Sequence, residues 1–124
     1  MENKENVILD LSFEFALKII DYTELLEEKR RFVIAKQLLK SGTSIGANIN
    51  EAQNAESRAD FIHKLKISAK EANETDYWLQ LCFKAKSYPN PDGLPEKLLS
   101  IQKLLSKIIS SAKSNNQHMN TSNN

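Results

Sequence analysis

The residues Gly42-Thr43-Ser44-Ile45-Gly46 match the G-x-S-x-G string of serine hydrolases. In those enzymes the serine lies on a strained turn between a strand and a helix, and a histidine base and an acid follow later in the chain. No strand-like run precedes Gly42, and His63 is the only histidine outside the polar tail. We therefore expect Ser44 to have no catalytic role and the two glycines to serve helix packing.

Two further groups of residues could bind a metal or act as a nucleophile. Asp60 and His63 are one helical turn apart, but di-iron centres in helical bundles need Glu-x-x-His pairs on two helices, with more glutamates on the others. Cys82 has no second ligand near it and is expected to be a buried, inert thiol. Neither a phosphate-binding glycine loop nor a zinc-ligand spacing is present. The sequence thus predicts no metal, no cofactor and no enzymatic activity.

The composition indicates one helical domain. The chain has 124 residues, 40% of them hydrophobic, with three glycines and three prolines and no run of alternating β-branched residues. This favours an all-α fold large enough to bury a core. A single cysteine, the lack of a basic-then-apolar leader and the lack of an apolar run near the ~18 residues of a membrane span predict a cytoplasmic protein.

Hydrophobic spacing and turn residues predict four helices joined by short connections, an antiparallel up-down four-helix bundle. The first helix is expected to have Asp10 or Ser12 as its N-cap, and a capping box from Ser57 to Asp60 begins the third. A turn is placed near residues 27–31, with one long helix as the alternative. The predicted helices cover residues 10–28, 32–55, 57–87 and 94–112; the bundle covers residues 1–113 and a disordered polar tail covers residues 114–124.

The first predicted helix carries more apolar residues than one bundle contact needs. One stripe holds Phe13, Leu17 and Ile20, and a second holds Phe15, Ile19, Tyr22 and Leu26. Packing inside one bundle needs only one apolar stripe. We therefore expect this helix to pack against another subunit as well.

The second predicted helix is rich in small residues, and Gly42, Ser44 and Gly46 are expected to let another helix approach closely. Asn48 falls on its apolar seam and is predicted either to set helix register or to serve a polar site. On the third helix, Trp78 is predicted to be a core or subunit-interface anchor. The predicted seams are Ile34, Leu38, Ser41, Ile45, Asn48 and Ala52; Phe61, Leu65, Ser68, Ala72, Thr75, Leu79 and Cys82; and Leu98, Ile101, Leu105, Ile108 and Ala112.

Charge is unevenly distributed along the chain, although the net charge is only +1. Residues 1–28 hold eight acids and two bases, a net charge of −6, so the remainder carries +7. From Lys97 to Lys113 there are four lysines and no acid. This face is either simply solvated or a surface that contacts phosphates. The candidate phosphate contacts are Lys97, Lys103, Lys107, Arg58 and Lys64.

Several blocks of the sequence resemble the bacterial four-helix bundle proteins encoded in intervening sequences of 23S ribosomal RNA genes. The matching blocks are residues 41–52 (SGTSIGANINEA), 55–57, 60–61, 70–75 and 77–79. The resemblance implies a cytoplasmic bacterial bundle that assembles as a homopentamer. A related family, the accessory variability proteins of diversity-generating retroelements, engages nucleic acid and a reverse transcriptase through a basic surface, whereas this chain is nearly neutral.

Two functions of different classes follow from these patterns. The first is a non-enzymatic, homo-oligomeric interaction module that contacts RNA or DNA. The alternative is a scaffold that binds a protein, such as a polymerase or reverse transcriptase, without touching nucleic acid.

Overall fold

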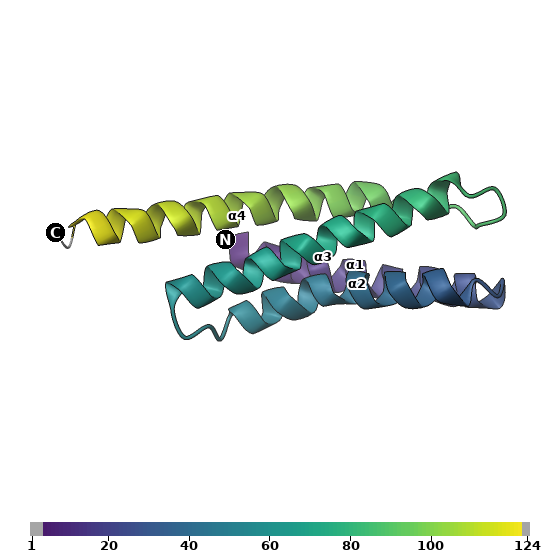
Figure 1. Cartoon of the computed structure of the whole chain (residues 1–124), viewed down its shortest axis with the longest axis horizontal. Helices are drawn as coiled ribbons and strands as arrows, with labels where there is room; N and C mark the ends of the chain where they lie inside the picture. The colour runs from purple at the N-terminus through teal and green to yellow at the C-terminus, as the bar shows by residue number, and fades with distance from the viewer. Residues whose placement is uncertain (1–3, 123–124) are drawn as a thin grey trace.

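The computed structural model describes the backbone of residues 4–122 and the side chains of residues 7–115. Residues 4–122 contain four α-helices and no strand, which confirms the all-α prediction. Successive helices run in opposite directions and are joined by short connections (Figure 1). The helices are α1 (Lys4–Glu28), α2 (Phe32–Ala52), α3 (Arg58–Lys84) and α4 (Leu94–Ser122).

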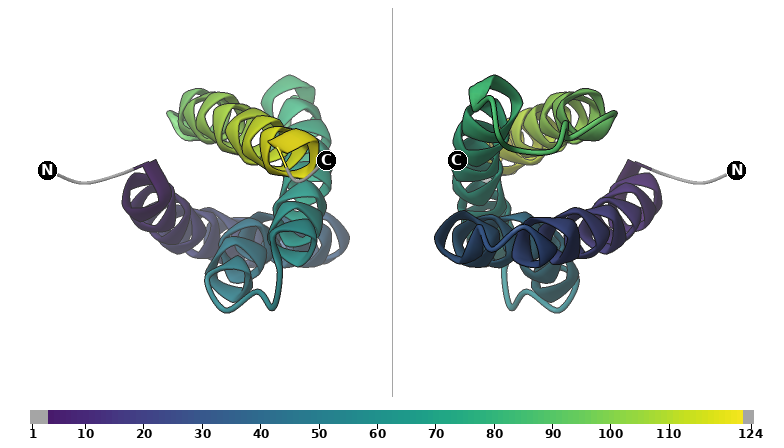
Figure 2. Two further views of the ribbon diagram at one scale, coloured as in Figure 1. Left: turned by 90° about the vertical axis from the view of Figure 1, so that its left-hand side faces the viewer. Right: turned by 90° about the vertical axis from the view of Figure 1, so that its right-hand side faces the viewer.

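The helices follow one another around the bundle in chain order. Helix α1 contacts α2 and α4, and α3 contacts the same two helices. Among the described residues the backbones of α1 and α3 stay apart (Figure 2), although the Tyr22 side chain of α1 reaches Cys82 of α3 through the core. Each helix therefore buries one face and turns another outward.

The core is built from the faces that meet at the centre. All five predicted seam residues of α4 are buried, as are six of the seven on α3. On α1 the buried stripe is the predicted second one, and the first stripe points outward. The largest fully buried side chains are Ile8, Phe15, Ile19, Leu26, Leu38, Ile45, Ile49, Leu65, Leu79, Leu98, Ile101 and Leu105.

The turn predicted near residues 27–31 is confirmed, so the single long helix is excluded. Helix α1 ends at Glu28, and Arg30 adopts a positive φ of 63° that reverses the chain. The Arg31 amide then donates to the Leu26 carbonyl at 2.8 Å. The connection between α3 and α4 lies at the same end of the bundle, and there Gly93 has a φ of 79°. This positive φ costs glycine little free energy because glycine has no β-carbon.

The predicted N-cap of α3 is also confirmed. Ser57 has extended backbone angles, and its hydroxyl accepts from the Asp60 amide at 3.0 Å. The Asp60 carboxylate in turn accepts from the Glu56 amide at 3.2 Å, and this bond lowers the pKa of Asp60. Two otherwise unpaired amide groups are thereby satisfied at the start of the helix.

The predicted start of the first helix was wrong. Helix α1 begins at Lys4, so neither Asp10 nor Ser12 is an N-cap. Ile8 is only 1% exposed, and packing of this apolar residue extends the helix in the N-terminal direction. Ser12 is a buried residue inside the helix, where its hydroxyl donates to the Leu9 carbonyl at 3.2 Å.

Three helix ends also differ from prediction. Helix α2 stops at Ala52 because the amides of residues 53–55 donate to carbonyls three residues back, which tightens the last turn. Helix α3 stops at Lys84 because Ala85 is extended. Helix α4 continues to Ser122, since no glycine or proline follows Pro95, and its end extends past the other helices (Figure 1). Ala112 is its last buried residue among those described, and the disordered tail stays a prediction.

Candidate interaction surfaces

Helices α1 and α2 approach closely because glycines on α2 leave room for α1. A β-carbon on Gly42 would lie 2.9 Å from two carbons of the Ile19 side chain. One turn later, a β-carbon on Gly46 would lie 3.2 Å from the Ser12 hydroxyl and 3.4 Å from the Ser12 carbonyl oxygen. Gly42 and Gly46 therefore allow α1 to pack closely on α2 within the protomer.

Helices α2 and α3 are joined by hydroxyl groups inside the core. The Ser41 and Thr75 hydroxyls are 3.0 Å apart, and both residues are fully buried. The Ser68 hydroxyl crosses from α3 to donate to the Ile45 carbonyl at 2.8 Å. Sequence analysis placed these three residues on seams but gave them no role; their positions among apolar seam residues were the available signal.

Asn48 has a different role from the one predicted. It is half-buried, and its amide nitrogen donates to the Ser44 carbonyl of its own helix at 2.8 Å. The prediction that Asn48 occupies the seam was wrong, because Ile49 takes the fully buried position. Ser44 is also half-buried and donates to the Lys40 carbonyl at 2.6 Å.

The two phenylalanines of α1 point to opposite sides of the helix. Phe15 is 1% exposed and lies in the core, whereas Phe13 is 67% exposed. Phe13 lines a groove of about 290 Å³ between α1 and α2, whose other lining residues are Leu9, Ser12, Ala16, Thr43, Gly46, Ala47 and Asn50. The outward stripe on α1 therefore meets solvent in the protomer.

Helix α3 carries aromatic side chains on and beside its outer face. Tyr77 is 57% exposed, and its ring meets the Trp78 ring edge-on at a centroid distance of 5.3 Å. Trp78 is half-buried and packs on the core, and its predicted role as a core or subunit-interface anchor stays a prediction. Its indole nitrogen is buried without a hydrogen-bond partner among the described residues.

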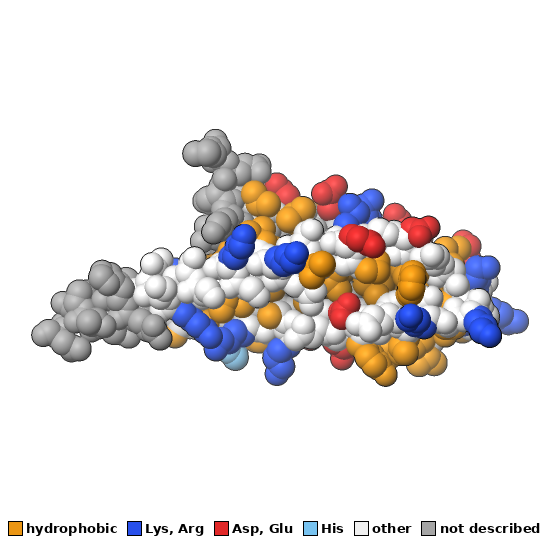
Figure 3. Space-filling model, turned by 90° about the horizontal axis from the view of Figure 1, so that it is seen from above, with side chains coloured by type: hydrophobic (Ala, Val, Ile, Leu, Met, Phe, Trp, Pro, Cys, Tyr) orange, Lys and Arg blue, Asp and Glu red, His pale blue; other side chains and the backbone are white. Residues whose placement is uncertain are grey.

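The predicted basic residues do not form one cluster. Lys103 and Lys107 are exposed on the outer part of α4, whereas Lys97 lines a pocket of about 160 Å³ with Glu14 of α1. On α3, Lys64 pairs with Asp60 at 3.4 Å, and the Arg58 guanidinium lies 6.0 Å from the centre of the Phe61 ring. Figure 3 shows the basic side chains over α4 and the α3 edge, and acidic ones along the α1 edge.

Lys66 and Lys113 form a contact between α3 and α4 that the sequence did not indicate. The proximity of Lys66 lowers the pKa of Lys113, because two positive charges close together favour loss of a proton from one of them. Farther along the same pair of helices, Gln102 donates to Asn73 at 3.3 Å. The Gln102–Asn73 bond joins exposed residues of α3 and α4, whereas the two lysines bring positive charge together on this pair of helices.

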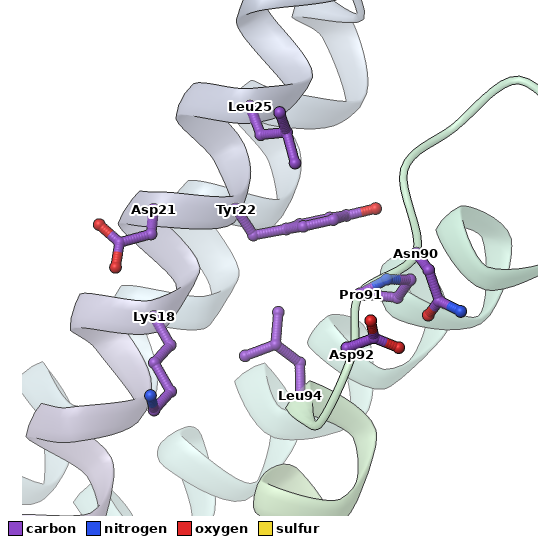
Figure 4. Close-up of a pocket in the computed structure, with 8 residues that line it drawn as sticks. All are labelled: Lys18, Asp21, Tyr22, Leu25, Asn90, Pro91, Asp92 and Leu94. Carbon is purple, nitrogen blue, oxygen red and sulfur yellow. The ribbon is translucent and has the colours of Figure 1, made fainter.

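A pocket of about 270 Å³ lies between α1 and the connection from α3 to α4 (Figure 4). The Tyr22 side chain points from α1 toward the connection, and its hydroxyl donates to the Pro89 carbonyl at 2.6 Å. Burial raises the pKa of Tyr22 and of its neighbour Cys82. Cys82 is a buried thiol, as predicted. This site anchors the connection to α1.

The residues considered for catalysis or metal binding lie apart. On α3 it is Ser68 that lies beside this part of α2, because its hydroxyl donates to the carbonyl of Ile45, the residue after Ser44. His63 is exposed and lies more than one turn nearer the start of α3, so it is not next to Ser44. Within the described residues, no group of three or more His, Cys, Asp or Glu side chains gathers as a metal site would. In the same part of the chain, no helix has the length and apolar character to cross a membrane.

Comparison with known proteins gives a family match and a match to a solved structure. The model of the family described as 23S rRNA-intervening sequence protein matches residues 4–111. A crystal structure of a protein of unknown function from the S23 ribosomal protein family of Bacteroides thetaiotaomicron is 49% identical, with a TM-score of 0.81. The match covers 87% of this chain and 99% of that one. No curated protein matches the chain.

Proposed function

Because the chain belongs to the family of 23S rRNA-intervening sequence proteins, we propose that it is a non-enzymatic bundle that assembles with copies of itself and contacts nucleic acid. The assembly is a homopentamer, the state implied by the family resemblance. Its role is that of an interaction module: the outer faces of the bundle bind partners, and the core only holds those faces in place.

The exposed apolar stripe on α1 is the observation that carries this proposal. Phe13, Leu17 and Ile20 are 67%, 50% and 38% exposed, although the opposite face of the same helix already fills the core. Contiguous exposed apolar side chains of this kind mark surfaces that bind other proteins. A second copy of the chain is the partner that is always present.

The basic outer part of α4 supports contact with nucleic acid. Lys103, Lys107 and Lys113 are exposed on this helix, and Lys66 of α3 lies near Lys113. A net charge of +1 per chain means that binding depends on this local concentration of lysines. Few phosphate contacts give weak binding that falls steeply as salt is added.

The assembly is tested by the solution mass of the purified protein at micromolar concentration, measured by light scattering. We expect a mass several times the 14.1 kDa of one chain, and a Leu17→Asp variant that is folded by circular dichroism but has a lower mass. The matched control is Leu99→Asp, since Leu99 is also 50% exposed but lies on α4. A wild-type mass of 14.1 kDa would contradict self-assembly.

Nucleic-acid contact is tested by fluorescence anisotropy with a labelled structured RNA and a labelled duplex DNA over a range of salt concentrations. The variant Lys103→Glu/Lys107→Glu should abolish binding. The matched control, Lys36→Glu/Lys40→Glu, makes the same charge change on the exposed side of α2 and should retain most of the affinity. Equal losses in both variants would show that only net charge matters, and absence of binding by the wild type at low salt would contradict this half of the proposal.

The near-neutral net charge favours the second candidate, a scaffold that binds a protein without contacting nucleic acid. The two candidates differ in an inexpensive observation, the gene neighbourhood. A reverse transcriptase or polymerase gene next to this one supports the scaffold, and a position inside a ribosomal RNA gene supports the first proposal.

A further inference from the structure

Two exposed apolar surfaces lie on opposite sides of the bundle. One is on α1 and the other on α3, whose backbones do not approach each other within the described part of the chain. Helices α2 and α4 each contact both α1 and α3 and separate their backbones (Figure 2). A single copy can therefore use both surfaces at once, each with a different neighbour.

The surface on α1 is apolar at its centre and acidic at its ends. Phe13, Leu17 and Ile20 follow one another at helical spacing, and exposed Asp10 and Glu24 lie before and after them on the same face. We call these five residues the acidic stripe. Asp10 and Glu24 make no ion pair within the described residues, so their charges are free to meet an external partner.

The surface on α3 has the same layout with the opposite charge. Tyr77 and Leu81 are 57% and 40% exposed, and exposed Lys70 and Lys84 lie before and after them. We call these four residues the basic stripe. At a rise of about 1.5 Å per residue, Asp10 to Glu24 and Lys70 to Lys84 both span about 21 Å.

The other charged residues between the ends of each stripe leave this opposition of charge in place, apart from Glu74. Of the acids between Lys70 and Lys84, Glu71 is half-buried near Lys40 of α2, and Asp76 accepts a hydrogen bond from Gln80 at 2.7 Å. Helical spacing puts both on the sides of α3, away from the basic stripe. Exposed Glu74, four residues after Lys70 and three before Tyr77, lies on the same face as the basic stripe and is its one charge of reversed sign. Lys18 directly follows Leu17 and therefore lies off the acidic stripe.

We propose that the acidic stripe of one copy packs against the basic stripe of the next copy. This inference rests on the proposed self-assembly and names the two surfaces that meet in it. The apolar centres bury each other, and the carboxylates at the ends of one stripe meet the ammonium groups at the ends of the other. Opposite charges at both ends fix the register and disfavour contact between two α1 helices, whose acids would repel.

A contact between two different surfaces of the same chain is head-to-tail. Such a contact leaves one free surface at each end of any open chain of copies, so copies keep adding and the assembly ends only when the rotation between neighbours closes a ring. A contact of α1 with α1 would instead stop at a dimer. The number of copies in the ring follows from the angle between the outer faces of α1 and α3.

Disulfide trapping tests which surfaces meet. Leu17 and Tyr77 lie at the midpoints of their stripes, so they oppose each other whether the two helices run parallel or antiparallel. The double variant Leu17→Cys/Tyr77→Cys, oxidised under mild conditions, should give a ladder of linked chains on a non-reducing gel. Each single variant should give no linked species, and the native Cys82 is buried and adds none. Within one chain the two new cysteines cannot pair, because Leu17 and Tyr77 are both exposed and the backbones of α1 and α3 do not approach each other among the described residues.

Charge reversal provides a second, independent test. We expect Asp10→Lys/Glu24→Lys to dissociate the assembly at least tenfold more readily in dilution experiments, and Lys70→Glu/Lys84→Glu to do the same. All four changes in one chain should restore the wild-type mass. Circular dichroism and thermal melting confirm that each variant folds.

The outcomes separate this inference from the proposed function. A wild-type protein that is monomeric at micromolar concentration overturns self-assembly and this inference with it. A multimeric wild type overturns only this inference if Leu17→Cys alone gives linked dimers, if the double variant gives no ladder, or if the α3 charge reversal leaves the mass unchanged.

Discussion

The side chain of Ile19 fills the space that a β-carbon on Gly42 would occupy. The distance would be 2.9 Å to both Cγ1 and Cγ2 of Ile19, shorter than carbon atoms tolerate. Ile19 is fully buried, so it has little room to move aside. This contact sets how closely α1 approaches α2, and it turns the opposite face of α1 outward.

The variant Gly42→Ala should therefore destabilise the protein, even though alanine is the better helix former. We expect the free energy of unfolding to fall by roughly 1–3 kcal/mol, the usual cost of overpacking a core. Urea denaturation followed by circular dichroism measures it. An increase in stability would show that the α1–α2 contact adjusts freely.

Gly46 provides the matched comparison. A β-carbon there would lie 3.2 Å or more from Ser12, so the Gly46→Ala clash is mild and is offset by about 1 kcal/mol of helix propensity. We expect little net change in unfolding free energy for Gly46→Ala. The larger Gly46→Leu should lose roughly 1–3 kcal/mol or more, because the whole side chain must fit against Ser12. A Gly46→Leu variant that melts like the wild type would contradict close packing at this position.

The helices were predictable from the sequence, but the position of the buried face on α2 was not. Helix α2 packs on α1 through Gly42 and on α3 through Ser41, so its buried arc is set by two neighbours at once. The predicted seam assumed a single repeating spacing, so it assigned to Asn48 the buried position that Ile49 occupies in the structure. Ser12 was predicted as a possible N-cap for a related reason. Its side chain packs against Gly46 of α2, and the sequence of α1 alone does not show this contact.

The buried hydroxyls of Ser41 and Thr75 should be energetically coupled. We expect Ser41→Ala and Thr75→Val each to lower the unfolding free energy by about 1 kcal/mol, because each removes the hydrogen bond between α2 and α3, although the remaining hydroxyl keeps a carbonyl acceptor on its own helix. The double variant should lose less than the sum, since both hydroxyls are then absent. Chemical denaturation of the four proteins in a double-mutant cycle measures the coupling. Additive losses would mean that the hydroxyls do not interact.

Stability should fall in alkaline solution because Tyr22 and Cys82 are buried. Burial raises the pKa of both groups above their ordinary values of 10.0 and 9.0. Once the pH exceeds these ordinary values, the unfolded chain releases protons that the folded chain retains, so the unfolding free energy decreases as pH rises. At pH values below these ordinary pKa values, the contribution of the two groups to the unfolding free energy does not change with pH.

The variant Tyr22→Phe should show a shallower decline above about pH 9 and a loss of about 1 kcal/mol at neutral pH, because the bond to Pro89 is removed. Urea titrations at a series of pH values measure both effects. Tyr77→Phe is the control for deleting a hydroxyl, since Tyr77 is 57% exposed. An unchanged alkaline slope in Tyr22→Phe would mean that other groups cause the decline.

The cap of α3 gives a prediction at acid pH. Ser57→Ala should cost about 1 kcal/mol, because the Asp60 amide loses its acceptor. The Glu56 amide lowers the pKa of Asp60 below its ordinary value of 3.8, so the contribution of this carboxylate is present above that value and is lost as pH falls through the lowered pKa. Thermal melts of wild type and Asp60→Asn should therefore converge at low pH; a constant difference would contradict this assignment.

The interaction surfaces were only partly predictable. The excess apolar stripe on α1 could be found in the sequence because helical spacing alone separates Phe13 from Phe15. The grouping of the lysines could not, because it depends on how the helices pair: Lys66 lies near Lys113, whereas Lys97 lines a pocket together with Glu14 of α1. Long-range register of this kind has no local signal in the sequence.

The solution mass of the wild type and of Leu17→Asp, measured side by side by light scattering, tests self-assembly most directly. The proposal predicts about five times 14.1 kDa for the wild type and a smaller, folded particle for the variant. A wild-type mass of 14.1 kDa, or a variant with unchanged mass, would contradict assembly through the outer face of α1.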